Sequence, residues 1–389
     1  MLAENKTIRK WDLITLAAVV CFTVSQVAVV QAADWFQFPL HPSKDGQESP
    51  DICGSVVVWQ QFVDTDFDIY GADITDLFKP FVFIITDDVD DQLAPSIYES
   101  TVVWQSYVET DWDIWAADIN VQTAPQSFAV SEYLDVNELA PAIHGNIVVW
   151  QYDYYGDRDI CGTDITDPNS PVEFPVALYD FEQQAPAVYR NTVVWQDDYF
   201  GDWDIYAADI WQRNKPAEFS VSLVEQDQQR PAIWGNIVVW QDDFFGDWDI
   251  YAADISEPDT PVEFAVTTDI SWQINPDIDA HLIVWQDDRN GNWDIFGYNL
   301  TTRQEFQITD DPADQTEPAI SGSVVVWQDE RNGNPEIYVA VLDGPEIAQC
   351  ASRIPGDIDG DCKVNFIDFS LMAGYWLECD LEPEEACWQ

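Results

Sequence analysis

The sequence predicts an all-β protein, a seven-bladed β-propeller closed by an N-terminal strand, with a small C-terminal module after it. Three observations lead to this prediction: a repeat of about 45 residues, four short β-type segments in each copy, and a lone β-type segment ahead of the first copy. The 389 residues then divide into an export signal (1–33), the propeller (34–344) and the module (345–389).

The repeat is marked by the dipeptide Trp-Gln, which recurs in register at intervals of 42 to 46 residues. Its tryptophans are Trp59, Trp104, Trp150, Trp195, Trp240, Trp285 and Trp327. Residues 237–240 are apolar without alternation, as expected for a strand covered on both faces. Asn290-Gly291, between the second and third segments, is a hairpin signal. No long helical pattern interrupts the segments, which favours four-stranded blades around an axis.

The phase of the repeat indicates how the ring closes. In six copies a Phe of the fourth segment stands 12 or 13 residues before the Pro that opens the next copy, as Phe219 stands before Pro231. The seventh copy has no such segment after Tyr338, but Phe38 stands twelve residues before Pro50. An N-terminal strand around Phe38 would therefore complete the last blade and remove the exposed edges of an open array.

Two of the copies carry a resemblance to a known family. The segments Trp285–Ile295 and Trp327–Ile337 resemble the TolB-like propeller repeats of exported bacterial proteins, and the resemblance covers residues 34 to 344. It implies the propeller fold. It implies no single function, because such propellers include binding subunits, surface proteins and some polysaccharide lyases.

The N-terminus predicts export. Three basic residues between positions 6 and 10 precede an apolar run from Leu13 to Val30, which ends at Ala32-Ala33. We expect a secreted or cell-surface protein without a membrane span after cleavage. A single membrane anchor is the alternative, because the run is long enough to cross a bilayer.

The formal net charge of −57 excludes one class of partner. Such a surface repels nucleic acid and anionic lipid, so no nucleic-acid partner is expected. It favours bound cations, but a salt-rich habitat would explain the same excess of carboxylates, so the charge identifies no ligand.

Residues 357–368 predict a Ca²⁺ site. The segment reads Asp-Ile-Asp-Gly-Asp-Cys-Lys-Val-Asn-Phe-Ile-Asp and places oxygen donors at the positions of a calcium loop. The predicted ligands are Asp357, Asp359, Asp361, Lys363 through its carbonyl, Asn365 and Asp368. An apolar stretch follows where the helix of such a module belongs, and a chance acidic loop is the alternative.

Together, Gly356 to Leu377 resemble one half of a type I dockerin, the module that docks carbohydrate-active proteins onto cohesins. The resemblance implies the same Ca²⁺ ligands and a cohesin-like or cell-surface protein as partner. The sequence departs from the family in two ways: one loop is visible where two are usual, and Cys362 occupies a position that is usually Gly.

The end of the chain is also rich in cysteine, which in an exported chain indicates a disulfide-stapled module. Four cysteines allow three pairings, and our working hypothesis joins Cys362 to Cys379 and Cys350 to Cys387. Cys53 and Cys161 fall at different positions of different repeats, so we expect both to be unpaired.

Ligand contacts are sought where the repeat varies. Three residues after each opening Pro, on the strand expected nearest the axis, the copies carry Cys53, Tyr98, His144, Tyr189, Trp234, Asp279 and Ser321. Four consecutive members of this set are aromatic, and Tyr98, His144, Tyr189 and Trp234 would stack on sugar rings if they faced the channel. Wedging between blades is the alternative, and the one we favour.

A second variable set lies at the tips of the hairpins between second and third segments. Three adjacent copies carry aromatic pairs there: Tyr154-Tyr155, Tyr199-Phe200 and Phe244-Phe245. Exposed aromatic groups beside carboxylates are typical of contact surfaces, including those for carbohydrate. Local packing of the tips on one another is the alternative.

No residue is predicted to be catalytic. The three histidines, His41, His144 and His281, occupy unrelated repeat positions, and no phosphate loop or nucleophile elbow occurs. The leading hypothesis is an exported binding or anchoring protein, without catalytic activity, whose propeller recognises a polysaccharide or surface protein and whose tail attaches it to a partner. The alternatives are a polysaccharide lyase or glycoside hydrolase, and a structural envelope protein.

Overall fold

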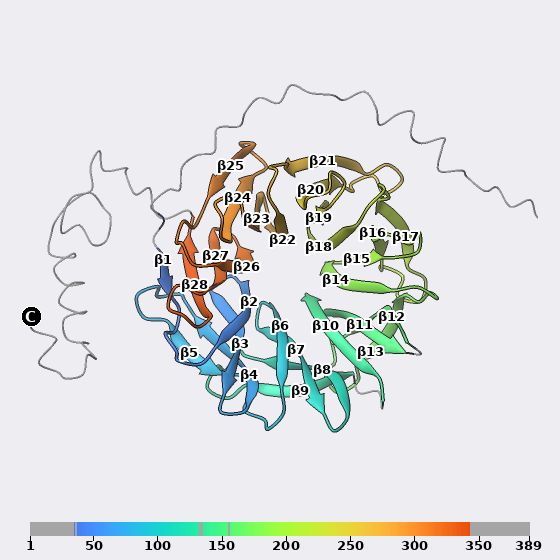
Figure 1. Ribbon diagram of the computed structural model, residues 1–389. Helices are drawn as coiled ribbons and strands as arrows, with labels where there is room; N and C mark the ends of the chain where they lie inside the picture. Colours follow the sequence, from blue (N-terminus) through green and yellow to red (C-terminus); the bar gives the residue numbers. More distant parts are fainter. Residues whose placement is uncertain (1–34, 36, 132–134, 155, 343–389) are drawn as a thin grey trace, which may run out of the picture.

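The computed structural model describes residues 35, 37–131, 135–154 and 156–342. In this part of the chain 28 strands form seven antiparallel sheets of four strands each, arranged as blades around an axis (Figure 1). The fold is thus the predicted all-β seven-bladed propeller. The same residues contain no helix that could cross a membrane.

The strands of the first four blades follow the chain order from the axis outward. Blade 1 contains β2 (Gln47–Cys53), β3 (Val56–Val63), β4 (Asp66–Asp73) and β5 (Phe81–Ile84). Blade 2 contains β6 (Gln92–Tyr98), β7 (Thr101–Val108), β8 (Asp111–Asp118) and β9 (Gln126–Ser131). Blade 3 contains β10 (Asn137–His144), β11 (Ile147–Tyr154), β12 (Asp157–Asp164) and β13 (Val172–Ala177). Blade 4 contains β14 (Gln183–Tyr189), β15 (Thr192–Asp197), β16 (Asp204–Asp209) and β17 (Ala217–Ser222).

The last three blades follow the same order, except that the outer strand of blade 7 comes from the N-terminal end of the propeller. Blade 5 contains β18 (Gln228–Trp234), β19 (Ile237–Asp242), β20 (Asp249–Asp254) and β21 (Val262–Thr267). Blade 6 contains β22 (Gln273–Asp279), β23 (Leu282–Asp287), β24 (Asp294–Asn299) and β25 (Gln304–Gln307). Blade 7 contains β26 (Gln315–Ser321), β27 (Val324–Asp329), β28 (Glu336–Val341) and, from the other end of the chain, β1 (Gln37–Pro39).

The strand β1 closes the ring as the phase of the repeat predicts. It pairs antiparallel with β28, with Gln37 opposite Ala340 and Pro39 opposite Tyr338. Leu40 then joins a buried cluster with residues of blades 1 and 7, and is 4% exposed. The N-terminal strand therefore completes blade 7 and anchors it to blade 1.

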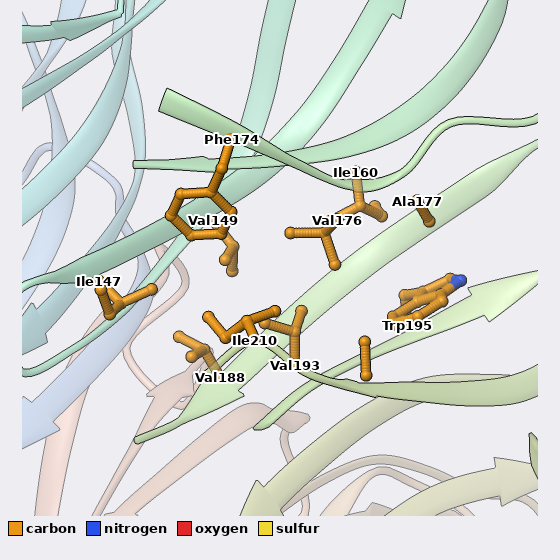
Figure 2. Packing of buried hydrophobic residues seen from close by; sticks show 11 residues of the cluster. Ile147, Val149, Ile160, Phe174, Val176, Ala177, Val188, Val193, Trp195 and Ile210 are labelled. Carbon is orange, nitrogen blue, oxygen red and sulfur yellow. The ribbon is translucent and has the colours of Figure 1, made fainter. Parts of the chain in front are cut away.

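Apolar side chains fill the space between blades. The Trp of every Trp-Gln pair is at most 2% exposed. Figure 2 shows the cluster between blades 3 and 4, where Ile160 and Val176 of blade 3 face Trp195 and Ile210 of blade 4. Because each blade buries one face against each neighbour, the continuous apolar second strand read from the sequence is explained.

The Gln of the Trp-Gln pair links neighbouring blades by a hydrogen bond. Its Oε1 accepts a backbone N–H from the first strand of the next blade, at 2.8 to 3.1 Å. The pairs are Gln60 with Ala94, Gln105 with Ala140, Gln151 with Ala185, Gln196 with Arg230, Gln241 with Asn275, and Gln286 with Glu317. Each donor residue precedes a Pro at a β-bulge, and its φ lies between 50° and 54°. The carboxamide thus stabilises an unfavourable backbone conformation.

A second recurring position carries a Gln in six blades and Glu138 in blade 3. All seven side chains are at most 1% exposed. Glu138 accepts a hydrogen bond from the Ser131 hydroxyl at 2.6 Å, and its second oxygen has no partner. Burial raises the pKa of Glu138 to about 8.

Removal of β1 should open the ring. A chain that starts at His41 should unfold at least about 3 kcal/mol more easily than one that starts at Asp34, because it loses the β28 pairing and the buried Leu40. Urea denaturation measures the difference, and light scattering should show association through the exposed β28 edge. Leu40→Ala keeps the strand and should fall between the two. Equal stability of both chains would contradict closure by β1.

Replacing Glu138 by Gln should stabilise the protein at high pH. Because the folded-state pKa lies above the ordinary value of 4.5, ionisation of Glu138 lowers the free energy of unfolding as pH rises from 4.5 to about 8. Glu138→Gln removes this loss, so its advantage should be near zero at pH 4.5 and on the order of 4 kcal/mol above pH 8. Urea denaturation at several pH values tests this. An advantage that does not change with pH would show that Glu138 does not titrate as described.

Candidate functional site

The first strand of each blade lies nearest the axis of the ring (Figure 1), and we call the region around this axis the channel. Along β2 the buried residues Pro50 and Ile52 alternate with the partly exposed Asp51 and Cys53, and the same alternation recurs in blades 2 to 6. Because side chains of a strand point alternately to its two faces, the positions of Asp51 and Cys53 face the axis. The last position of the strand lies at one mouth of the channel.

Four consecutive blades place an aromatic ring at this mouth. Tyr98, His144, Tyr189 and Trp234 end β6, β10, β14 and β18, and we call them the aromatic crescent. The ring centroids are 4.2 Å apart from Tyr98 to His144, 4.6 Å from His144 to Tyr189 and 5.5 Å from Tyr189 to Trp234. All four side chains are half-buried. They form one continuous row across more than half of the ring.

The crescent also packs into the blades. Tyr98 contacts the core cluster that includes Ile143, and Tyr189 contacts the one that includes Ile233. Each of these rings therefore leans on the inner strand of the next blade while part of it remains exposed. The sequence left two alternatives for these rings, facing the channel or wedging between blades. Tyr98 and Tyr189 do both.

The other half of the mouth is polar. Cys53 Sγ accepts the Glu99 N–H at 3.1 Å, and Ser321 Oγ accepts the Gly54 N–H at 2.9 Å. Asp279 Oδ2 accepts the Gly322 N–H at 2.5 Å. Each contact again joins one blade to the next, so the mouth has an aromatic side in blades 2 to 5 and a polar side in blades 6, 7 and 1.

Two charged turn residues flank the crescent. The Arg190 guanidinium lies 5.3 Å from the centroid of the Tyr189 ring, and Glu99 follows Tyr98 in the chain. Burial, with a smaller effect of Arg190, holds the pKa of His144 below its ordinary value of 6.5. His144 is therefore neutral at pH 7. It offers an uncharged aromatic ring with one hydrogen-bond donor and one acceptor.

Two carboxylates lie one step deeper in the channel, a feature that the sequence analysis missed. Asp51 accepts the Ile97 N–H and Asp277 accepts the Ile320 N–H, both at 2.8 Å. Burial, with a smaller contribution from the charge of Asp51, raises the pKa of Asp277 to about 7. The other blades carry Ser or Ala here: Ser96, Ala142, Ala187, Ala232 and Ala319. Only comparison of blades at this one position distinguishes the two aspartates from the many others.

The aromatic hairpin tips lie at the opposite end of the strands. Tyr199, Phe200, Phe244 and Phe245 are 48 to 62% exposed, and the two rings of each pair are 4.8 and 5.0 Å apart. The crescent ends the first strand of a blade, whereas these tips follow the second strand, which runs back. The two predicted ligand surfaces are therefore on opposite faces. The side chains of Tyr154 and Tyr155 lie outside the described residues.

The predicted calcium ligands and the four C-terminal cysteines lie outside the described residues, as does the export signal. Within residues 35–342, the described part contains no group of three or more His, Cys, Asp or Glu side chains placed to hold a metal. Cys53 and Cys161 are free thiols there, and burial raises the pKa of both.

No protein-family model and no curated protein matches the chain. Among solved structures, an oligogalacturonate lyase from Vibrio parahaemolyticus is 13% identical, with 80% of this chain and 96% of that chain covered and a TM-score of 0.59. A puromycin-hydrolyzing peptidase from Mycobacterium tuberculosis is 13% identical, with 81% and 54% covered and a TM-score of 0.58. TolB from Acinetobacter baumannii is 15% identical, with 65% and 62% covered and a TM-score of 0.47.

The chain spans about half the length of the peptidase and less than two thirds of TolB. At 13% identity, the likeness to the lyase and the peptidase shows the propeller fold alone.

Proposed function

We propose that this chain is an exported, non-catalytic binding protein whose propeller recognises a polysaccharide at the aromatic crescent. The observation that carries the proposal is the row of four half-buried rings in contact across blades 2 to 5. Sugar rings present apolar C–H faces that stack on such side chains, and the packing of the crescent into the blades fixes the rings before binding.

The polar side of the mouth supplies the remaining contacts. Asp279 and Ser321 end the first strands of blades 6 and 7, which follow the crescent in the ring, and Asp277 lies two residues before Asp279 on β22. Carboxylate and hydroxyl oxygens accept hydrogen bonds from sugar hydroxyls. The negative charge of the carboxylates opposes the entry of an acidic sugar. A neutral polysaccharide therefore fits the mouth better than a polyuronate.

The tail is proposed to attach the propeller to a partner. The oxygen donors between Asp357 and Asp368 suit Ca²⁺, which would order the loop and present the module to a cohesin-like or cell-surface protein. This part of the proposal rests on the sequence pattern.

The crescent is tested by removing two of its rings. Tyr189→Ala with Trp234→Ala should weaken retention of the protein on neutral polysaccharides at least about tenfold, which corresponds to about 1.4 kcal/mol. The matched control, Phe244→Ala with Phe245→Ala, removes two exposed rings from the opposite face and should bind as the parent does.

The same incubation measures released sugar. Retention without release supports a binding protein, and released oligosaccharide would replace it by a polysaccharide-degrading enzyme. Loss of retention in the control variant alone would move the site to the hairpin tips.

The calcium loop is tested by titration of Ca²⁺ into the whole chain. Asp357→Ala with Asp361→Ala should abolish binding at this loop, because it removes two of the charged ligands. Glu384→Ala with Glu385→Ala removes the same charge outside the loop and should leave binding intact. Equal loss in both variants would attribute Ca²⁺ binding to general acidity.

A further inference from the structure

A cavity of about 440 Å³ lies between blades 1 and 2, on the face that carries the hairpin tips. Its walls come from the loop between β5 and β6, with Asp88 and Asp90, and from Ser106 of β7, Trp115 of β8 and Ser127 of β9. Its volume is within the range of about 300 to 1,000 Å³ usual for small-molecule sites. We call it the blade 2 pocket.

Two polar atoms at the blade 2 pocket have no partner. Gln92 is 1% exposed, and its Oε1 accepts no hydrogen bond. The indole Nε1–H of Trp115 is buried and donates none. The Oε1 of the corresponding glutamine is unpaired in blades 4 to 7 as well, so this atom does not distinguish the blade 2 pocket. The unpaired Trp115 N–H does distinguish it, because the other blades carry no tryptophan at this position, and an unpaired buried donor is costly.

The chain itself shows what fills this place in another blade. In blade 6 the guanidinium of Arg289 lies 4.3 Å from the centroid of the Phe296 ring. It donates to Asp287 at 2.9 Å and to Glu305 at 2.6 Å, and a longer contact of 3.4 Å reaches Thr267. Arg331 of blade 7 repeats the arrangement over a tyrosine ring, with a buried aspartate as its acceptor.

Strand register identifies the counterparts of these residues in blade 2. Phe296 is opposite Trp285 as Trp115 is opposite Trp104. By the same register Asp287 corresponds to Ser106, Glu305 to Ser127, and Thr267 to Thr86. All four counterparts line the blade 2 pocket. The residue at the position of Arg289 is Val108, so the chain supplies no arginine to fill the space.

The two replaced carboxylates decide the charge of the occupant. Arg289 is held by Asp287 and Glu305, both largely buried, whereas the blade 2 pocket offers the hydroxyls of Ser106 and Ser127 in their place. A guanidinium would lose both of its ion pairs there. A neutral group rich in hydroxyls would find donors and acceptors on every side and an indole face in place of the phenyl ring.

We infer that the blade 2 pocket is a binding site for one residue of a neutral sugar. The sugar ring stacks on Trp115, and its hydroxyls bond to the hydroxyls of Ser106 and Ser127. The carboxylates of Asp87, Asp88 and Asp90 at the exposed rim accept further hydroxyls and repel uronic acids. This site is on the face opposite the aromatic crescent and does not depend on the function proposed for it.

The test uses the whole chain with ¹⁵N-labelled tryptophan. Trp115→Phe identifies the Trp115 indole N–H resonance by its disappearance, and the methyl glycosides of glucose, galactose and mannose are the probes. At least one of them should shift this resonance in a saturable way. Ser127→Trp fills the pocket from an exposed position and should weaken that binding at least tenfold, while Ser170→Trp, on an exposed turn of blade 3, should leave it unchanged.

Galacturonic acid and methylguanidinium test the charge. Neither should shift the resonance at concentrations where the neutral glycoside saturates, and a response to methylguanidinium in place of the glycosides would overturn the inference. So would the absence of any response to the glycosides, or unchanged binding by Ser127→Trp. The Tyr189→Ala, Trp234→Ala variant should bind the glycoside as the parent does, and its failure would contradict a site separate from the crescent.

Discussion

The hydrogen bond from the bulge of one blade to the glutamine of the preceding blade holds the first strand of six blades in place. It holds a residue with positive φ just before a proline, a conformation that costs on the order of 1 to 3 kcal/mol without compensation. The bulge shifts the register of the first strand, so that in blade 6 the positions of Asp277 and Asp279 turn toward the axis. The buried Trp beside each glutamine keeps water from competing for the bond. The link precedes each residue of the aromatic crescent and Asp277 on its own strand, and it holds that strand against the preceding blade.

Most of the fold could be predicted because the blades of a propeller appear in the sequence as a repeat, whose period gives the number of blades and whose phase gives the position of each strand. The period placed seven tryptophans, and the phase assigned a segment near Phe38 to the last blade, where β1 is found. Strand direction is also contained in the repeat, and it separates the crescent from the Phe244-Phe245 tip, although the sequence analysis treated the two sets side by side. The C-terminal loop remains a prediction from its spacing.

The site was less accessible to sequence reasoning, for physical reasons. Asp51 and Asp277 look like any of the other acidic residues until strand register places them on the axis. The blade 2 pocket results from side chains that are missing, and the effect of Ser106, Val108 and Ser127 becomes visible only beside the filled arrangement around Arg289. Small side chains that leave a cavity form no sequence motif. Whether a half-buried ring such as Tyr189 faces the channel or the next blade depends on packing that a single position does not encode.

Closure by β1 has a consequence for the order of events when the chain is made. Gln37 leaves the ribosome before the other strands of the propeller, and its partner Ala340 is among the last residues of the propeller to follow. Contacts of such long sequence separation form slowly, because the loop between them must be closed first. Blades 1 to 6 can form as they emerge, but the ring stays open at blade 7 with the edge of β28 exposed. In the final folding step the first strand of the propeller to be made must therefore find the last, and association with another copy competes with this pairing during that interval.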